Sequence, residues 1–248
     1  MATDYRARVR KLMETAQNYT DKGNEQAALS YAEKAAALAT KHGVEDALNE
    51  AFDEVKLNLT RKTVTVSNPY PKHRISLLGT IGRIFGCRVL KCGRNIAEVY
   101  GDERDIERVM FIYRVLSVHM LDGVAKARPE LPERDGDKHW YFKSEGLTPA
   151  ETKSFRVAWI VGYVQVIGER MKEAYTQTVS ESTHTGAALV LADRRSMVDN
   201  FIKELGIRVV SGSKIRVNAA GYEAGRKAGA QADLGQTRVD PRRLALGA

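Results

Sequence analysis

The longest apolar pattern in the chain lies between Pro149 and Val179, and it predicts a helix that is buried on several sides. Thr148 precedes a proline and can act as the N-cap, and Glu151 stands three residues later, where a capping box places an acid. Apolar side chains then fall on nearly every face from Phe155 to Ile167. Charged residues resume at Glu169, well short of the ~20 apolar residues that cross a bilayer. We therefore expect a buried central helix and no membrane segment.

Helical spacing also dominates the start of the chain and predicts a helical hairpin over residues 5–42. Apolar residues recur at helical spacing up to Ala16, the pattern stops near Asp21–Asn24, and an alanine-rich stripe then runs to Ala39. His42–Gly43 ends the second helix. Because alanines let two backbones approach, the two helices are expected to pack closely.

The next stretch is expected to divide the chain. Residues 45–60 continue at helical spacing, and Thr63–Pro71 alternates apolar and polar residues before its prolines, which predicts a short edge strand and a turn. Ser67–His73 is the expected linker. The predicted parts are an N-terminal helical domain over 1–66, an α+β domain over 67–232 and a basic flexible tail over 233–248.

Helical and strand periods alternate within the second part. A helix is expected at Ile75–Phe85, a β-hairpin around Gly93–Asn95, and a long helix capped by Asp102 that packs against the central helix. The elements expected after the central helix are a strand at Ala188–Ala192, a helix at Ala192–Gly206, a strand at Ile207–Val210 and a helix at Lys214–Ala228. The predicted fold class is α+β: an N-terminal helical hairpin, then a helix-rich domain with small β-hairpins around a buried central helix.

Composition changes this picture in one respect, the charge, which indicates a class of partner. The 248 residues are 43% hydrophobic, enough to bury a core. Lysine and arginine number 39 against 31 acids, a net charge of +8, which favours an anionic partner such as nucleic acid. With two cysteines and a charged N-terminus that lacks a signal-peptide pattern, the expected location is the reducing cytoplasm.

Strong catalytic and metal-binding motifs are absent from the sequence. Cys87 and Cys92 should point to opposite faces of one strand, as partly buried free thiols, and no second Cys/His pair stands at zinc-finger spacing. No phosphate loop, dinucleotide fingerprint, H-E-x-x-H helix or nucleophile elbow occurs, and His119 is expected to be a satisfied core histidine. We expect no cofactor and no catalysis. An enzyme whose site is assembled only in space stays open as a third hypothesis.

The candidate partner-binding residues are three bases around the expected β-hairpin and three consecutive aromatics in a charged surface loop over 127–146. They are Arg88, Lys91, Arg94, Trp140, Tyr141 and Phe142. The bases can neutralise phosphates or simply form a solvated face, and the aromatics can bind a partner or hold the loop onto the core. A further basic pair, Arg194–Arg195, is expected to open a helix. No helix-turn-helix, zinc finger or RNA-binding motif supports sequence-specific base reading.

Several short motifs resemble those of a known family. The matching residues are Lys11-Leu12, Asn24-Glu25, Ala27-Ala28, Ala35, Leu38 and Lys41-His42-Gly43-Val44. This stretch resembles a small uncharacterised domain family common in actinobacterial and phage proteins. With the Ser-Phe-Arg helix at 154–156, the Tyr-x-x-Gly-x-x-x-Gly segment at 222–229, the size and the charge, the chain resembles the recombination directionality factors of actinobacterial temperate phages that use large serine integrases.

The resemblance implies a function carried out by protein–protein interaction. Such a protein binds the large serine integrase of the same phage, while the integrase holds attachment-site DNA, and switches it from integration to excision without catalysis. It acts in the cytoplasm of the bacterial host, and weak or non-specific DNA contact is compatible with that role. The charge supports an alternative, a basic DNA-binding accessory or regulatory protein.

Overall fold

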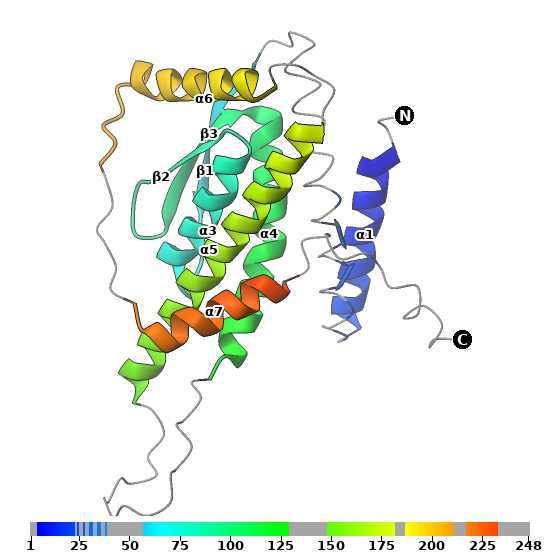
Figure 1. The fold of residues 1–248 in the computed structure, drawn as a ribbon, viewed down its shortest axis with the longest axis vertical. Coiled ribbons are helices and arrows are strands. Elements are labelled where there is room, and N and C mark those ends of the chain that lie inside the picture. The colour runs from blue at the N-terminus through cyan, green and yellow to red at the C-terminus, as the bar shows by residue number, and fades with distance from the viewer. Residues whose placement is uncertain are drawn as a thin grey trace, which may run out of the picture.

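A computed structural model describes residues 4–22, scattered residues between 24 and 38, and residues 57–128, 148–181, 187–210 and 217–232. The fold is α+β, a small antiparallel sheet with helices on both of its faces (Figure 1). Its elements are α1 (Asp4–Asp21), β1 (Leu59–Thr65), α3 (Pro71–Ile84), β2 (Arg88–Lys91), β3 (Ile96–Asp102), α4 (Glu103–Lys126), α5 (Pro149–Glu181), α6 (Ala187–Glu204) and α7 (Ala219–Gln231).

The three strands form a sheet in the order β1-β3-β2, with both pairs antiparallel. The β2–β3 hairpin is confirmed, and β1 is an edge strand as expected, but it lies at Leu59–Thr65, earlier than the predicted Thr63–Pro71, and begins within the stretch predicted to be helical. However, β1 pairs with β3 along its whole length, from Leu59 opposite Asp102 to Thr65 opposite Ile96. The expected domain boundary between residues 66 and 67 thus separates a strand from its own sheet, because strand pairing joins segments that are far apart in sequence. β1 belongs with the α+β unit.

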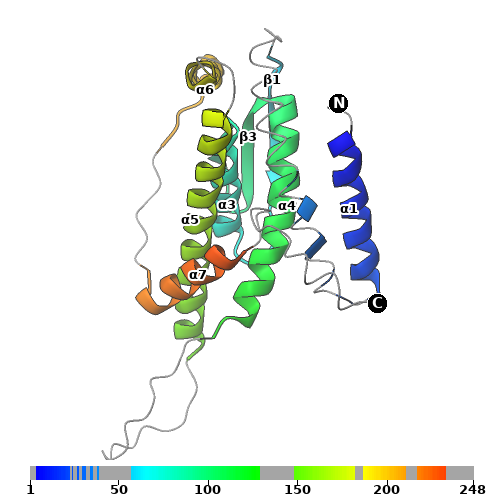
Figure 2. The same ribbon diagram turned by 45° about the vertical axis from the view of Figure 1, so that its right-hand side comes forward.

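Helices α3, α4, α5 and α7 are layered on one face of the sheet (Figure 2). Helices α3 and α4 lie against the strands, α5 packs on both of them, and α7 crosses α5. On β3, Ala97 and Val99 point into this core and are fully buried. Ile160, Tyr163 and Ile167 of α5 are fully buried as well. The predictions of a buried central helix and of its packing against the long helix α4 are therefore confirmed.

The helix starts follow the predicted caps. The Thr148 hydroxyl accepts from the Glu151 N–H at 3.3 Å, and the Glu151 carboxylate accepts from the Thr148 N–H at 2.9 Å, which is a complete capping box. The Asp102 side chain accepts from the Arg104 N–H at 3.1 Å and caps α4. Local sequence therefore sets where the two longest helices begin.

The crossing of α5 and α7 is close because glycines lie at the contact. A Cβ atom on Gly225 would stand 1.9 Å from the Trp159 carbonyl oxygen, and one on Gly162 would stand 2.1 Å from the Tyr222 carbonyl oxygen. Neither position has room for any side chain. At the end of α7, Arg170 donates to the carbonyl of Gly229 at 2.8 Å.

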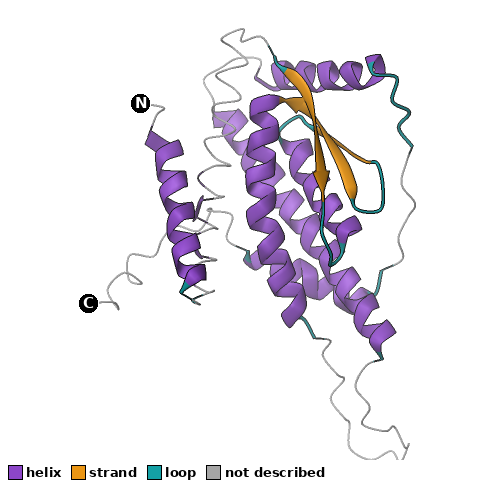
Figure 3. Ribbon diagram, turned by 180° about the vertical axis from the view of Figure 1, so that it is seen from behind, coloured by secondary structure: helices purple, strands orange, loops and turns teal. Residues whose placement is uncertain are grey.

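Helix α6 lies across one end of the opposite face of the sheet (Figure 3). Its Val198 and Ile202 pack against Tyr100 of β3. The sequence predicted a strand at Ala188–Ala192, and this was wrong: these residues are the first turns of α6, because alanine and leucine favour a helix that continues into the next segment. The strand predicted at Ile207–Val210 was also wrong, since these residues pair with no described strand. The last helix begins at Ala219, later than predicted.

The N-terminal hairpin is confirmed within the residues that the structure describes there. Helix α1 ends at Asp21, and the Asn24 side chain accepts from the Ala27 N–H at 3.1 Å, as a cap of the next helix does. The rings of Tyr19 and Tyr31 stack with their centroids 5.4 Å apart, which brings the two arms together. Residues 45–56 and the tail expected at 233–248 lie outside the described residues. No helix in the described ranges is both long and apolar enough to cross a membrane.

Candidate interaction surface

The β2 strand forms one edge of the sheet, and the backbone groups of its successive residues alternately bond to β3 and point outward. The Cys92 N–H donates to the Ile96 carbonyl at 3.0 Å, so the hydrogen-bonded pairs of this antiparallel ladder fall at even-numbered positions of β2. The N–H and C=O groups of Val89 and Lys91 therefore point away from β3. Beneath this edge, Val89 packs on α3 at Gly82, which supports the strand from the core side.

The three candidate basic residues occupy different environments along the hairpin. The Arg88 guanidinium forms a two-pronged ion pair with Asp199 of α6, with Nε–Oδ1 at 2.5 Å and Nη2–Oδ2 at 2.9 Å. This pair holds the pKa of Asp199 below its usual range and raises the pKa of Arg88, first through the hydrogen bonds. Arg88 thus joins β2 to α6, whereas Lys91 and Arg94 are exposed at the other end of the hairpin. The aromatic candidates Trp140, Tyr141 and Phe142 lie outside the described residues.

Apolar side chains are also exposed in the segment that follows α6. Ile207, after α6, packs against the Tyr100 cluster that Leu90 of β2 also contacts. Beyond it, Val209 is 59% exposed and Val210 is 77% exposed. Figures 1 and 3 show this segment leaving α6 on the β2 side of the sheet. We call the outward edge of β2 together with Lys91, Arg94, Val209 and Val210 the β2-edge surface.

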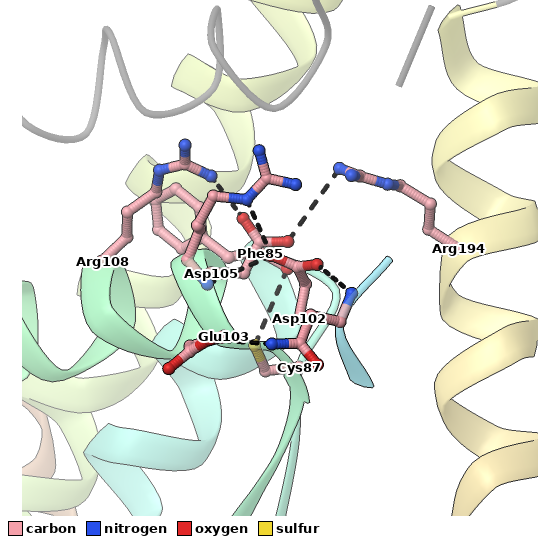
Figure 4. A network of polar contacts seen from close by, with 9 residues as sticks. Phe85, Cys87, Asp102, Glu103, Asp105, Arg108 and Arg194 are labelled. Carbon is pink, nitrogen blue, oxygen red and sulfur yellow. Dashed lines mark hydrogen bonds and ion pairs between the residues drawn. The ribbon is translucent and has the colours of Figure 1, made fainter. Parts of the chain in front are cut away.

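A buried polar cluster ties α4 to α6 (Figure 4). Asp105 is 7% exposed, and its carboxylate lies 2.6 Å from Nη1 of Arg108 and 4.0 Å from Nη1 of Arg194. Burial raises the pKa of Asp105, and the charges of the two arginines oppose that shift. Asp102 accepts from the Asn58 N–H at 2.9 Å. The cluster fixes the start of α4 relative to α6 and to the residue that leads into β1.

The two cysteines are free thiols without the environment of a nucleophile. Cys87 is buried, and burial together with the nearby carboxylates of Asp105 and Asp102 raises the pKa of its thiol. Burial and Glu98 also raise the pKa of the Cys92 thiol. A raised pKa keeps the sulfur protonated and weakly reactive. The predicted opposite orientation is confirmed, but Cys92 is exposed rather than partly buried, because it lies on the uncovered face beside the turn.

Beside the buried cluster is a small cavity of about 20 Å³, roughly the space of one water molecule. Tyr175 of α5 and Arg195 of α6 are among its lining residues. Among the described residues, no group of three or more His, Cys, Asp or Glu side chains is arranged to hold a metal ion. His119 is bonded in the core, with Nδ1 3.0 Å from the Tyr163 hydroxyl oxygen, which confirms its expected role.

Sequence reasoning missed the partners of the basic residues. Arg194 was expected to open a helix on the surface, but it lies within α6 with an 11% exposed side chain directed at Asp105 (Figure 4). Asp199 was not singled out at all, although it neutralises Arg88. The spacing of Asp105 and Arg108, three residues apart on a predicted helix, was the one local signal available. The contacts to α6 bridge distant segments and leave no such local pattern.

Comparison with known proteins gives one partial match. The family model of a protein of unknown function, DUF2786, matches residues 4–46, which covers α1 and the start of the following segment. No curated protein and no solved structure matches the chain.

Proposed function

We propose that this protein is a recombination directionality factor, which binds the large serine integrase of the same phage and switches it from integration to excision. The residues that carry the family resemblance support this proposal, as does the placement of several of them in a distinct N-terminal hairpin. The proposed location is the cytoplasm of the bacterial host, where the integrase meets its DNA. The proposed role needs no catalytic residue.

The observation that carries a protein-binding role is the β2-edge surface. The exposed bases Lys91 and Arg94 would suit many anions, but Val209 and Val210 are apolar and largely exposed. Apolar side chains beside charged ones are typical of surfaces that bind other proteins, since a DNA backbone offers them nothing to bury against. The surface therefore favours a protein partner.

Switching an integrase requires only differential affinity. A protein that binds one integrase conformation more tightly than another shifts the population toward the first, in proportion to the difference in binding free energy. A shift from mostly one state to mostly the other needs about 5.5 kcal/mol of such preference. The total binding free energy of an ordinary protein interface is larger than this, so a preference of that size for one conformation can come from part of the interface.

Recombination of the two hybrid attachment sites tests the proposal. The integrase alone should leave these sites unrecombined, and addition of this protein should produce the excision products. The integrase with the phage and bacterial sites serves as the control, where the same addition should reduce integration. If recombination direction is unchanged and no complex with the integrase forms, the proposal is wrong.

The net charge of +8 supports the second candidate, a DNA-binding accessory protein. In that case the protein alone should bind attachment-site DNA, and its association constant should fall steeply with salt, with a slope of about −0.9 for each phosphate neutralised. A gel-shift or anisotropy titration at several salt concentrations measures this slope. The absence of binding at low salt would remove this candidate.

A further inference from the structure

We infer that the outer edge of β2, which pairs with no strand among the described residues, is the docking site for an extended acidic segment of the integrase, which joins the sheet as a fourth strand. The inference rests on the proposed function and names the surface through which it would operate. Addition of a strand to an open sheet edge is a common mode of peptide recognition, in which main-chain hydrogen bonds supply affinity and neighbouring side chains supply specificity.

The backbone of β2 is arranged for such pairing. The outward N–H and C=O groups of Val89 and Lys91 have the spacing that an antiparallel or parallel strand can bond. Val89 rests on α3 at Gly82, where a Cβ atom would lie 3.0 Å from Cγ2 of Val89, so the strand is held firmly from below. The outward backbone groups of β2 are therefore already held in the geometry that an added strand would bond.

Charge decides what kind of strand fits. Lys91 and Arg94 lie at one end of the edge, and the exposed Arg83 and Arg208 lie on the elements that flank it, whereas Arg88 is already paired with Asp199. A second copy of this chain would bring another +8 charge to the contact and is disfavoured. A segment rich in Asp and Glu would be attracted and oriented along the edge.

Apolar contact separates a protein strand from DNA. Alternate side chains of an added strand would lie on the face of Leu90, which packs with Ile207 in the Tyr100 cluster, and Val209 and Val210 follow Ile207 in the chain and are exposed. A segment that alternates acidic and apolar residues would satisfy both the bases and the valines. A phosphate backbone would satisfy only the bases.

Two charge-reversed proteins with the same change in net charge test the site. The test variant is Lys91→Glu/Arg94→Glu, and the control is Lys153→Glu/Lys227→Glu, whose lysines are exposed on α5 and α7. Binding of each full-length protein to the integrase is measured by biolayer interferometry. The test variant should bind about tenfold more weakly, and the control should stay within about twofold of the wild type.

A second variant and a backbone measurement keep the test independent of charge. Val209→Asp/Val210→Asp places acids on exposed positions and should also weaken binding about tenfold, with an unchanged thermal unfolding midpoint. Hydrogen exchange of the wild type should show the Val89 and Lys91 amides becoming protected in the complex.

The outcomes separate the two proposals. If the wild type redirects recombination but both variants bind the integrase as it does and the two amides stay unprotected, the β2 edge is not the interface and only this inference fails. If the charge-reversed variant loses DNA binding while it keeps integrase binding, the surface contacts DNA and the inference is again overturned. If the wild type neither binds the integrase nor redirects recombination, the proposed function fails and the inference falls with it.

Discussion

At the scale of single residues, Asp105 is the most consequential charge in the described part of the chain. A buried carboxylate is costly unless cations and hydrogen bonds compensate for its lost hydration, and here Arg108 and Arg194 do so. The burial of Asp105 raises its pKa, so the folded protein holds a proton there at higher pH than the unfolded chain does. Arg108 opposes the effect of burial on the pKa of Asp105. Substitution of Arg108 should therefore change how the free energy of unfolding depends on pH.

We expect Arg108→Met to lower the free energy of unfolding by about 3 kcal/mol at pH 7, because it leaves Asp105 buried with one cation fewer. Loss of the arginine raises the pKa of Asp105 further, and the folded variant then binds more protons than the unfolded chain between the ordinary pKa and the raised one. Its stability relative to wild type should therefore recover as pH falls from 7 toward 5. Urea unfolding at several pH values measures the difference.

The double variant Asp105→Asn/Arg108→Met provides the control for this prediction. It has no carboxyl at position 105, so the recovery at low pH should disappear. A destabilisation of Arg108→Met that stays constant over this pH range would contradict the assignment of the charge effect to Asp105. Histidines and other carboxyls titrate in both proteins and cancel in the difference.

The cluster also shows what residue-level sequence reading can reach. The cap at Asp102 is local and was predicted from the sequence. The three-residue spacing of Asp105 and Arg108 is also local, but the pair was not predicted. Arg88 and Arg194 were read as exposed phosphate-binding candidates, yet both face carboxylates on another element. Charge alone does not reveal which bases are already neutralised, because that depends on the tertiary contacts of α6.

At the scale of elements, the crossing of α5 and α7 depends on residues that have no side chain. Gly162 and Gly225 bring the two backbones to a separation that excludes even a methyl group. The four-residue spacing of glycines in α7 is typical of close helix packing. It did not predict which helix would be met, since the complementary Gly162 lies in a different part of the sequence.

Gly225→Ala should destabilise the protein by about 1–3 kcal/mol or more, because its Cβ would stand 1.9 Å from the Trp159 carbonyl oxygen. Gly79→Ala in α3 is the matched control: its Cβ would meet Val89 Cβ at 3.8 Å, an ordinary contact, and alanine favours a helix by roughly 0.5–1 kcal/mol. Urea unfolding with hydrogen exchange of α7 compares the two. Equal effects of both substitutions would show that the crossing does not limit stability.

Prediction of the elements succeeded where periodicity and caps acted together. The helices that begin at Glu103 and Pro149 carry helical periodicity and a cap, and the hairpin around Gly93–Asn95 carries strand periodicity and turn residues. All three elements are present. Ala188–Ala192 and Ile207–Val210 are short apolar runs without a cap, and short runs do not distinguish strand, helix and irregular backbone. Their state depends on whether a neighbouring strand is available to pair with, which is a tertiary property.

At the scale of the whole molecule, the positive charge should act mainly on the rate at which a partner is met. Long-range attraction between a basic protein and an acidic surface speeds diffusional encounter, and salt screens it because the Debye length falls to about 8 Å at physiological ionic strength. The apolar contacts of the β2-edge surface are insensitive to that screening. Association and dissociation should therefore respond differently to salt.

We predict that the association rate constant with the proposed integrase partner falls at least about tenfold as salt rises from about 50 mM to about 500 mM, while the dissociation rate constant changes little. Stopped-flow or interferometry traces at each salt concentration give both constants. Lys91→Glu/Arg94→Glu should flatten the salt dependence of association, since two of the steering charges are reversed. An association rate constant that does not vary with salt would contradict this prediction. The net charge of +8 would then favour the alternative partner, DNA.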